Sequence, residues 1–291
     1  MTPIRKTPNA AVPSPEMLRA LAILVKDPKN YVFVISGRDQ FTLDSWLGHI
    51  SGLGLSAEHG CFIKYPEDSS KWLNLSEEID LAWKNDVAEI FTYYTERTQG
   101  SFIEHKRCSI TWHYRLADPE YGAFQAKECQ NHLENAILSK LPVEVLVGKK
   151  NLEVRPISIN KGGIVKRLTS QRKASDFVFC VGDDKTDEDM FKALKPCRAT
   201  DVPEESIFTV TIGSATKKTQ ASWHVSSPES VIGLLRQMAA ISVDDGVEDE
   251  ALSTTTNGSS TMMTERSKTG DNASNGELVG LDGDSGITIQ S

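Results

Sequence analysis

Residues 177–194 constrain the fold of this chain more than any other segment. An apolar run opens the segment and a glycine follows it, Phe177-Val178-Phe179-Cys180-Val181-Gly182. Aromatic and β-branched residues in such a run are typical of a short strand buried on both faces. Apolar residues then recur at helical spacing up to Leu194, and Thr186 with Asp189 has the spacing of an N-terminal capping box. The segment therefore predicts a strand, a loop and a helix.

The predicted loop is strongly acidic. Four aspartates and one glutamate fall within residues 183–189, where their mutual repulsion needs a cation or solvent to offset it. In open parallel sheets, ligands bind at the carboxyl ends of the strands, and this loop lies at such an end. The loop is therefore either a cation site or a solvated acidic turn, and the rest of the chain has to distinguish the two.

Two more apolar segments predict strands that end in small polar loops. Residues 31–35 are continuously apolar and precede Ser36-Gly37-Arg38-Asp39, while residues 55–60 predict a third short strand and a turn. Helical spacing of apolar residues covers 16–25 and 41–50. Because strands and helices alternate along the chain, the sequence predicts a parallel α/β sheet.

An α+β segment interrupts this pattern between residues 72 and 157. It contains two predicted helices, at 77–98 and 119–139, and predicted paired strands at 101–106, 109–114, 143–147 and 152–155. The core pattern resumes at Asn160-Lys161-Gly162-Gly163, with a later strand at 207–212 and a helix at 228–240. We therefore divide the chain into a first core segment (1–71), an inserted cap domain (72–157), a second core segment (158–241) and an acidic Ser/Thr/Gly-rich tail (242–291) that we expect to be disordered.

The composition limits the classes of function. The net charge is −8, but residues 242–291 alone hold ten acidic and two basic residues, so the body is balanced and has no sign of a nucleic-acid-binding surface. The five cysteines are scattered and show no disulfide framework or zinc spacing, so a reducing compartment fits them best. Because neither a membrane-spanning run nor a signal peptide is apparent, we expect a cytoplasmic protein with no membrane partner.

Three polar groups are expected on one edge of the sheet: Ser36, Lys161 and the acidic loop. A hydroxyl and an ammonium group can hold phosphoryl oxygens, and carboxylates bind a hard cation, so together they meet the requirements of Mg²⁺-assisted phosphoryl transfer. Taken alone, Ser36 is also consistent with a turn residue, and Lys161 with a solvated lysine at the start of a helix. The order of the three groups relative to three strand ends makes their combination more specific.

The order of these motifs resembles that of the haloacid dehalogenase superfamily, and specifically of its trehalose-6-phosphate phosphatases. The likeness covers residues 2–241, and its most diagnostic portions are two cap segments, 101–119 and 149–156. It implies a haloacid dehalogenase-like Rossmannoid parallel-sheet core with an inserted α+β cap. It also implies Mg²⁺-dependent hydrolysis of trehalose 6-phosphate to trehalose and phosphate.

The resemblance implies roles for individual residues. Ser36 would bind the phosphoryl group and Lys161 would neutralise its charge. Mg²⁺ would be held by Asp183, with Asp184 and Asp187 completing or orienting the metal site, and the sequence leaves open which of them are direct ligands. The residues expected to bind the sugar phosphate are Arg38, Glu104, Lys106, Arg115, Lys149, Asn151 and Glu153.

Strand geometry supports the assignment of a sugar-binding face to the cap. Residues two apart on a strand point to the same face, so Glu104 and Lys106 share one face, as do Lys149, Asn151 and Glu153. Acidic, basic and amide groups suit the hydroxyls of a disaccharide, and lysine or arginine suits its phosphate. A charged solvent-facing surface is the alternative for either strand alone.

The chain departs from the family pattern at its amino terminus. In the family, the nucleophile is the first aspartate of an Asp-x-Asp-Gly-Thr-Leu motif that runs directly into Thr-Pro-Ile, whereas here Thr2-Pro3-Ile4 follows Met1. We therefore expect the first core strand and both catalytic aspartates to be absent, and the polypeptide as written to be inactive and poorly folded. A truncated gene model, or a fragment of a longer protein with an upstream trehalose-phosphate synthase-like domain, would explain this departure.

Two other functions remain open at this point. A non-catalytic subunit would bind the sugar phosphate through its cap or would scaffold a complex of trehalose-phosphate synthase subunits. A phosphatase for another sugar phosphate would keep the core motifs but would need a different cap face. Phosphate release from trehalose 6-phosphate, measured with and without the restored strand, distinguishes these alternatives.

Overall fold

The structure, a computed structural model, describes residues 12–68, 70–171, 177–195 and 202–244. The Thr2-Pro3-Ile4 segment, Cys197 and the predicted disordered tail after residue 244 lie outside the described residues. Within the described ranges, no helix has the length and apolar character needed to cross a membrane.

The core contains two sheets. The first has the order β1-β2-β3-β4, in which β1 and β2 are parallel and the other pairs are antiparallel. The second has the order β11-β10-β9 and is parallel throughout. The strands of the two sheets are β1 (Phe33–Ile35), β2 (Gly54–Ala57), β3 (Phe62–Lys64), β4 (Leu73–Asn74), β9 (Val178–Gly182), β10 (Ile207–Ile212) and β11 (Trp223–Val225). The predicted parallel α/β core is therefore confirmed, with an antiparallel extension at β3 and β4 that the sequence pattern does not predict.

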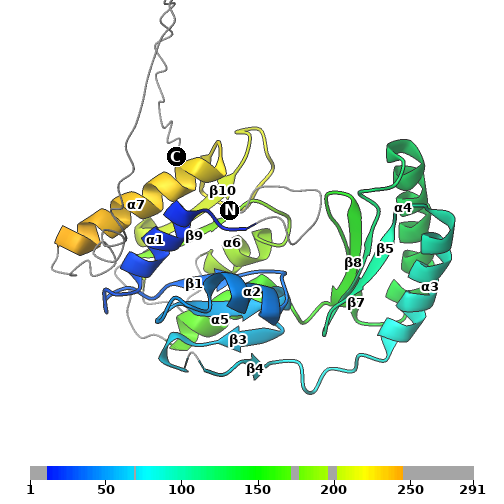
Figure 1. The fold of residues 1–291 in the computed structure, drawn as a ribbon, viewed down its shortest axis with the longest axis horizontal. Helices are drawn as coiled ribbons and strands as arrows, with labels where there is room; N and C mark the ends of the chain where they lie inside the picture. Colours follow the sequence, from blue (N-terminus) through cyan, green and yellow to red (C-terminus); the bar gives the residue numbers. More distant parts are fainter. Residues whose placement is uncertain (1–11, 69, 172–176, 196–201, 245–291) are drawn as a thin grey trace, which may run out of the picture.

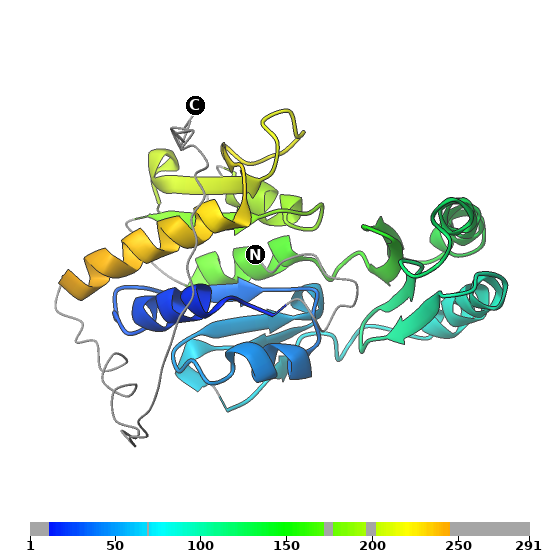
Figure 2. The ribbon, with the colours of Figure 1, turned by 45° about the horizontal axis from the view of Figure 1, so that its top comes forward.

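Helices cover both faces of the core. On one face, α1 (Pro15–Leu24) and α7 (Pro228–Asp244) lie side by side (Figure 2) and pack on apolar residues of β1, β9 and β10, while α2 (Gln40–Leu47) packs beside α1 on β2. On the other face, α5 (Lys161–Gln171) and α6 (Glu188–Leu194) pack on Ile35 of β1 and on Val178 and Cys180 of β9. The two core sheets thus share their helical layers, which is the arrangement that buries apolar strands on both faces.

The two sheets meet at strands that do not pair. Among the described residues, β1 pairs only with β2 and β9 pairs only with β10, so one edge of each strand has no neighbouring strand. All residues of β1 and the first four of β9 are only half-buried. The prediction that these apolar runs are fully buried strands is wrong for this reason, because a strand with an open edge keeps some of its side-chain and backbone surface exposed.

The cap is a separate antiparallel sheet with two helices. Its strand order is β5 (Phe102–His105), β6 (Ile110–His113), β8 (Asn151–Pro156) and β7 (Val143–Val147). The helices α3 (Trp83–Arg97) and α4 (Pro119–Leu133) pack on one face, where Phe91, Trp112 and Val154 are fully buried. Figure 1 shows these helices on the side of the sheet away from the core. The opposite face of the cap sheet therefore faces the core.

Two local predictions at helix starts are wrong. The helix predicted from residue 77 begins at Trp83, after a turn in which the Asp80 carboxylate accepts the backbone N–H of Ala82. The predicted capping box at Thr186 does not form either, because the Thr186 hydroxyl donates to Asp184 at 2.6 Å and α6 starts without a side-chain cap. Short polar side chains compete for such local hydrogen bonds, and here the loop uses Thr186 before the helix can.

Candidate active site

The acidic loop and the start of α5 form a buried ion pair. Lys161 is the first residue of α5, and its Nζ lies 2.7 Å from Asp187 Oδ1, with both side chains buried. Burial alone would lower the pKa of Lys161, but the charges of Asp187, Asp184 and Asp183 outweigh it and raise that pKa above its ordinary value. Lys161 therefore stays charged, and its ammonium group faces the carboxylates of the loop.

Asp187 holds the loop in shape. Its second oxygen, Oδ2, accepts the backbone N–H groups of Asp183 and Asp184 at 2.8 and 3.0 Å. The Asp187 carboxyl group lies so close to Gly182 that an added Cβ there would come within 2.2 Å of its Cγ. Since both oxygens are occupied by the lysine and the backbone, Asp187 is placed to orient the loop, and only a residue without a side chain fits at Gly182.

Asp183 and Asp184 present their carboxylates to solvent. The ligand atoms of Asp183, Asp184 and Asp187 lie within 4.8 Å of one another. No described residue donates a hydrogen bond to the Asp183 carboxylate, whereas Asp184 Oδ1 accepts the N–H and hydroxyl of Thr186. Burial opposes ionisation of Asp184, but the charge of Lys161 and the Thr186 hydrogen bonds lower its pKa to about 2. An oxygen-only set of carboxylates matches the ligand preference of a hard cation such as Mg²⁺.

Ser36 and Gly37 form the second loop of the site, directly after β1. Ser36 Oγ accepts the backbone N–H of Arg38 at 3.1 Å, and the Ser36 carbonyl accepts the N–H of His59. The imidazole of His59 packs on Gly37 so closely that an added Cβ there would lie 2.4 Å from Nε2. This glycine therefore permits the close approach of a buried histidine to the loop.

His59 links the core loop to the cap, and it is absent from the residues predicted for the site. It has a left-handed backbone (φ 58°), its side chain is buried, and its Nε2 lies 3.6 Å from Glu153 Oε2 on β8. Burial lowers the pKa of His59, the charge of Glu153 opposes that shift, and the nearby charges of Lys161 and Arg155 add to it. The only sequence signal is its position at the end of a strand, in the turn Glu58-His59-Gly60.

The cap face that meets the core carries a row of polar residues across its strands. Glu104, Thr111 and Glu153 are register partners on β5, β6 and β8. Glu104 Oε2 lies 2.7 Å from His113 Nε2, and the Glu153 carboxylate accepts the Ser109 hydroxyl at 2.7 Å. The two predicted hairpins are neighbours within one sheet, so Glu104 of the first and Glu153 of the second lie on the same face of that sheet.

Lys106 connects this cap face to the core loop. Its Nζ donates to Glu153 Oε1 and to the Gly37 carbonyl, each at 3.2 Å. Burial alone would lower the pKa of Lys106, but the charges of Glu153 and Glu104 raise it above its ordinary value. Burial alone would raise the pKa of the Glu153 carboxyl, but the charge of Lys106 helps to hold that pKa well below its usual value. The pair is therefore fully charged at neutral pH.

Of the remaining predicted binding residues, Arg115 and Lys149 lie just beyond the ends of cap strands, and Arg38 lies in the core. Arg115, just after β6, donates to the Lys149 carbonyl in the β7–β8 turn, and both side chains are exposed. Lys149 lies in this turn and not on β8, so it does not follow the alternation expected from Asn151 and Glu153. In the core, Arg38 lies over the Trp46 ring at 5.1 Å. Burial lowers the pKa of Arg38, opposed by the charge of Glu104 on the cap.

A family model decides the assignment of the chain. The model described as trehalose-phosphatase matches residues 1–229. The chain belongs to the trehalose-phosphatase family. A trehalose-phosphatase from Schizosaccharomyces pombe is 54% identical over 242 residues, which are 82% of this chain and 29% of that protein. The chain thus spans less than a third of the length of this curated relative.

Solved structures of the trehalose-phosphatase family share the fold. The C-terminal domain of a trehalose-6-phosphate phosphatase from Candida albicans is 43% identical, with a TM-score of 0.76, over 82% of this chain and 88% of that domain. A haloacid dehalogenase-like hydrolase from Bacteroides thetaiotaomicron is 14% identical, with a TM-score of 0.52, over 77% of this chain and 92% of that one, and shows the fold alone. The core and cap therefore have the haloacid dehalogenase-like fold predicted from the sequence.

Arg155 of the cap also contacts the core, and like His59 it is absent from the residues predicted for the site. Arg155 on β8 has a buried side chain whose guanidinium donates to Glu144 Oε1 on β7 and lies 3.5 Å from Asp189 Oδ2 on α6. Its Nη1 is buried with no hydrogen-bond partner among the described residues. Arg155 thus places a positive charge between the cap and the helix that follows the acidic loop.

The cysteine prediction is wrong for this trehalose-phosphatase family member. The structure joins Cys61 of the core to Cys108 of the cap in a disulfide across 47 residues of sequence. Their spacing predicts no framework, because only the folding of the cap back onto the core brings the two residues together. Cys129 and Cys180 are free thiols.

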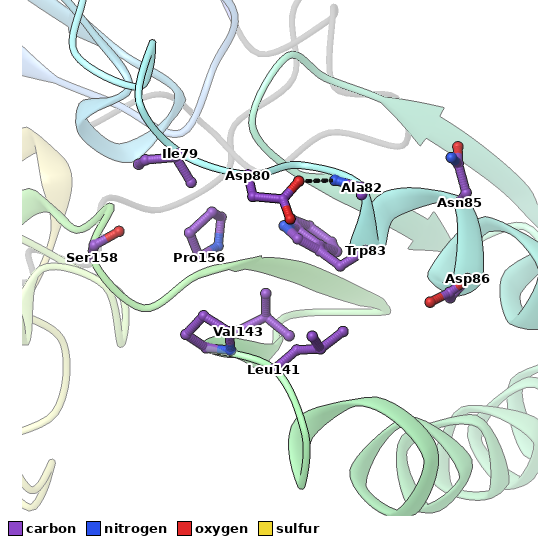
Figure 3. Close-up of a pocket in the computed structure, with 11 residues that line it drawn as sticks. Ile79, Asp80, Ala82, Trp83, Asn85, Asp86, Leu141, Val143, Pro156 and Ser158 are labelled. Carbon is purple, nitrogen blue, oxygen red and sulfur yellow. Dashed lines mark hydrogen bonds between the residues drawn. The ribbon is translucent and has the colours of Figure 1, made fainter.

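A pocket lies apart from these residues, where the two chain connections between core and cap pass each other. Figure 3 shows Ile79 and Asp80 of one connection opposite Pro156 and Ser158 of the other, with Trp83 beside Asp80 at the start of α3. The Trp83 indole N–H is buried and has no hydrogen-bond partner in the described ranges of the chain. None of the residues at the acidic loop or the Ser36 loop lines this pocket.

Proposed function

We propose that the protein carrying this chain hydrolyses trehalose 6-phosphate to trehalose and phosphate. The observation that carries the proposal is the position of Lys106, whose Nζ contacts both Glu153 in the polar row of the cap and the Gly37 carbonyl beside Ser36. A ligand between the two surfaces would have its sugar hydroxyls at the cap row and its phosphate at the core loop. This division matches a sugar phosphate, which needs both kinds of contact at once.

Ser36 and Lys161 act on the phosphoryl group in this proposal. The Ser36 Oγ accepts a backbone N–H, which leaves its O–H to donate to a phosphoryl oxygen. Lys161 is held as an ammonium ion by Asp187 and supplies positive charge where negative charge develops during phosphoryl transfer. The nucleophile and the general acid and base are the two aspartates of the family motif Asp-x-Asp, which do not occur as such a motif in residues 1–71.

Asp183 and Asp184 would hold Mg²⁺. Their carboxylates are exposed and offer free oxygens, whereas both oxygens of Asp187 are engaged, so Asp187 orients the loop and does not bind metal directly. The ion would supply charge neutralisation for the phosphoryl oxygens. Lys217 supports the loop from beyond β10, since its Nζ donates to the Asp183 carbonyl at 2.8 Å.

The cap provides the contacts that select the substrate. Glu104, Glu153 and Asn151 offer acceptors and donors for sugar hydroxyls, with the basic residues Arg38, Lys106, Arg115 and Lys149 around them. Residues 72–157 form the cap in this proposal, and residues 1–71 and 158–241 form the core. We place the reaction in the cytoplasm, and a trehalose-phosphate synthase as an associated partner.

Phosphate release tests this function. The natural full-length protein is assayed with trehalose 6-phosphate, glucose 6-phosphate and sucrose 6-phosphate in the presence of Mg²⁺. We expect turnover of trehalose 6-phosphate, with Glu104→Gln and Glu153→Gln raising KM more than Ser36→Ala does, because the cap residues contact the sugar. Binding without turnover would favour the non-catalytic subunit, and equal turnover of the three substrates would favour a phosphatase of broader range.

A further inference from the structure

Cys61 and Cys108 form a buried contact between the core and the cap. Cys61 follows the 3₁₀ turn Glu58–Gly60 in the core, and Cys108 lies in the turn between β5 and β6 of the cap. Their Cα atoms are 6.5 Å apart, within the range that a disulfide spans, and their side chains are 0% and 1% exposed. The sulfur pair thus lies between two regions of the fold whose other covalent links, among the described residues, are the two chain connections.

The surroundings of the sulfur pair fix the cap turn in position. The Glu58 carboxylate accepts the backbone N–H groups of Arg107 and Cys108 at 3.0 and 2.7 Å. The Ser76 hydroxyl lies 3.1 Å from each sulfur, and Ser76 is located just before the chain passes from core to cap. A core turn, a cap turn and a chain connection therefore converge on the two cysteines.

We propose that Cys61 and Cys108 are a redox modification site, whose reversible disulfide, formed by exchange with a low-molecular-weight disulfide, locks the cap onto the core. The consequence for turnover rests on the proposed phosphatase function, but the existence of the disulfide does not. The bond adds a third covalent link to the two chain connections, at a different point of the interface.

The step is a thiol–disulfide exchange. The thiolate of one cysteine attacks a sulfur of the external disulfide, which expels one thiolate and leaves a mixed disulfide on the protein. The thiolate of the second cysteine then attacks the protein-side sulfur and expels the second external thiolate. Two cysteine thiols are oxidised, one external disulfide is reduced to two thiols, and the two cysteine protons go to the leaving thiolates.

A metal ion fits this cluster less well than a disulfide does. Glu58, Cys61 and Cys108 have ligand atoms close together, but both carboxylate oxygens of Glu58 accept backbone N–H groups. A tetrahedral thiolate site would need both sulfurs apart around an ion and a free oxygen on Glu58.

The lock would act on the candidate active site through Lys106. Lys106 lies two residues before Cys108, and its Nζ contacts the Gly37 carbonyl and Glu153. A fixed turn would hold Lys106 against the core loop, and opening of the cap would need this contact to separate. Because closure and opening of such lids control substrate entry and product release in many enzymes, the disulfide would slow turnover.

Mapping of the linkage tests the site directly. The natural full-length protein is fully reduced, treated with glutathione disulfide, blocked with N-ethylmaleimide and digested for mass spectrometry. We expect a linked peptide pair that contains Cys61 and Cys108, and we expect Cys129 in no linked pair, because among the described residues no second sulfur lies beside it. Free thiols at both positions after oxidation, or a stoichiometric zinc ion in the reduced protein, would overturn the proposal.

Activity assays of oxidised and reduced protein distinguish failure of the proposed disulfide lock from failure of the proposed phosphatase function. We expect oxidised protein to turn over trehalose 6-phosphate more slowly than reduced protein, with recovery after dithiothreitol. Cys61→Ser and Cys108→Ser should be insensitive to oxidation, and the matched control Cys129→Ser should stay sensitive. A mapped disulfide with equal rates before and after reduction would refute the lock, whereas a mapped disulfide in a protein inactive in both states would refute only the proposed function.

Discussion

Lys161 Nζ and Asp187 Oδ1 lie 2.7 Å apart, and both side chains are almost fully buried. Asp187 also accepts two backbone N–H groups of the acidic loop through its other oxygen. One carboxylate thus keeps Lys161 charged and shapes the loop that carries the exposed aspartates. The pair matters for stability, because loss of either partner leaves a buried charge without compensation, and in the proposed function it also matters for activity.

Asp187→Asn should destabilise the protein and lower kcat. Removing one partner of a buried ion pair costs about 3 kcal/mol, and the amide cannot offer two acceptor oxygens to Lys161 and the loop together. The shift of the urea midpoint measures the loss. Asp183→Asn is the matched control, since Asp183 is exposed and its carboxylate accepts no hydrogen bond from a described residue. Equal midpoints for the two variants would contradict the structural role of Asp187.

Asp183→Asn should affect metal dependence and not stability. In the acidic cluster, the carboxylate of Asp183 and the Oδ2 atom of Asp184 accept no hydrogen bond from a described residue, and each carboxylate removed weakens binding of a hard cation. We expect a higher Mg²⁺ concentration for half-maximal activity, and a smaller increase in Tm on addition of Mg²⁺ than in the wild type. If Asp187→Asn alone changed the Mg²⁺ dependence while Asp183→Asn left it unaltered, the assignment of ligands would be reversed.

His59→Asn should reduce the decrease in the free energy of unfolding that occurs as the pH falls below neutral. Because burial lowers the pKa of His59, the unfolded chain binds a proton near pH 6.5 while the folded chain does not. Stability is therefore full above that pH and falls as the pH decreases from it toward the lowered pKa. Asparagine tolerates the positive φ of this position and does not titrate. A urea series between pH 5 and 8 should show a smaller slope for the variant, and identical slopes would contradict the burial of a neutral imidazole.

Gly37→Ala should destabilise the loop in a way that depends on His59. The new Cβ would lie 2.4 Å from His59 Nε2, and such overpacking costs about 1–3 kcal/mol. The same substitution in a His59→Ala background should cost much less, because the clashing ring is gone. A double-mutant cycle on the urea midpoints measures this coupling. Additive effects of the two substitutions would show that Gly37 is needed for a reason other than the approach of the imidazole.

Sequence reasoning succeeds where a single segment determines its own structure. The strand predicted at 207–212 has both of its ends at the predicted residues, and the pairing of the cap hairpins follows from alternation. The local signals fail where a tertiary contact decides the outcome. His59 gains its role only because the cap brings Glu153 to it, and Cys61 meets Cys108 only after the cap folds back.

In the candidate site, too, some features are predictable from a single segment and others depend on tertiary contacts. The positions of Ser36, Lys161 and the acidic loop at strand ends and a helix start are predictable from the order of elements. The different environments of Asp183 and Asp187 are not, because four aspartates in one short loop look alike in sequence and differ only in which neighbours reach them. Arg155 is likewise indistinguishable from an ordinary strand residue until its partners on β7 and α6 are known.

The open edges of β1 and β9 lead to a last prediction. Both strands are half-buried, share helical layers on both faces and pair with no strand between them among the described residues. An added strand with the family's Asp-x-Asp-Gly-Thr-Leu sequence would satisfy both edges and place its aspartates beside Ser36 and Asp183, because parallel strands bring their carboxyl ends to one edge.

We expect the 291-residue polypeptide alone to release no phosphate from trehalose 6-phosphate and to bind a hydrophobic dye. The same polypeptide preceded by this strand should gain activity and lose dye binding, with a variant that carries Asn-x-Asn as the control that folds but stays inactive. Turnover by the unextended polypeptide itself would show that its own residues supply the nucleophile.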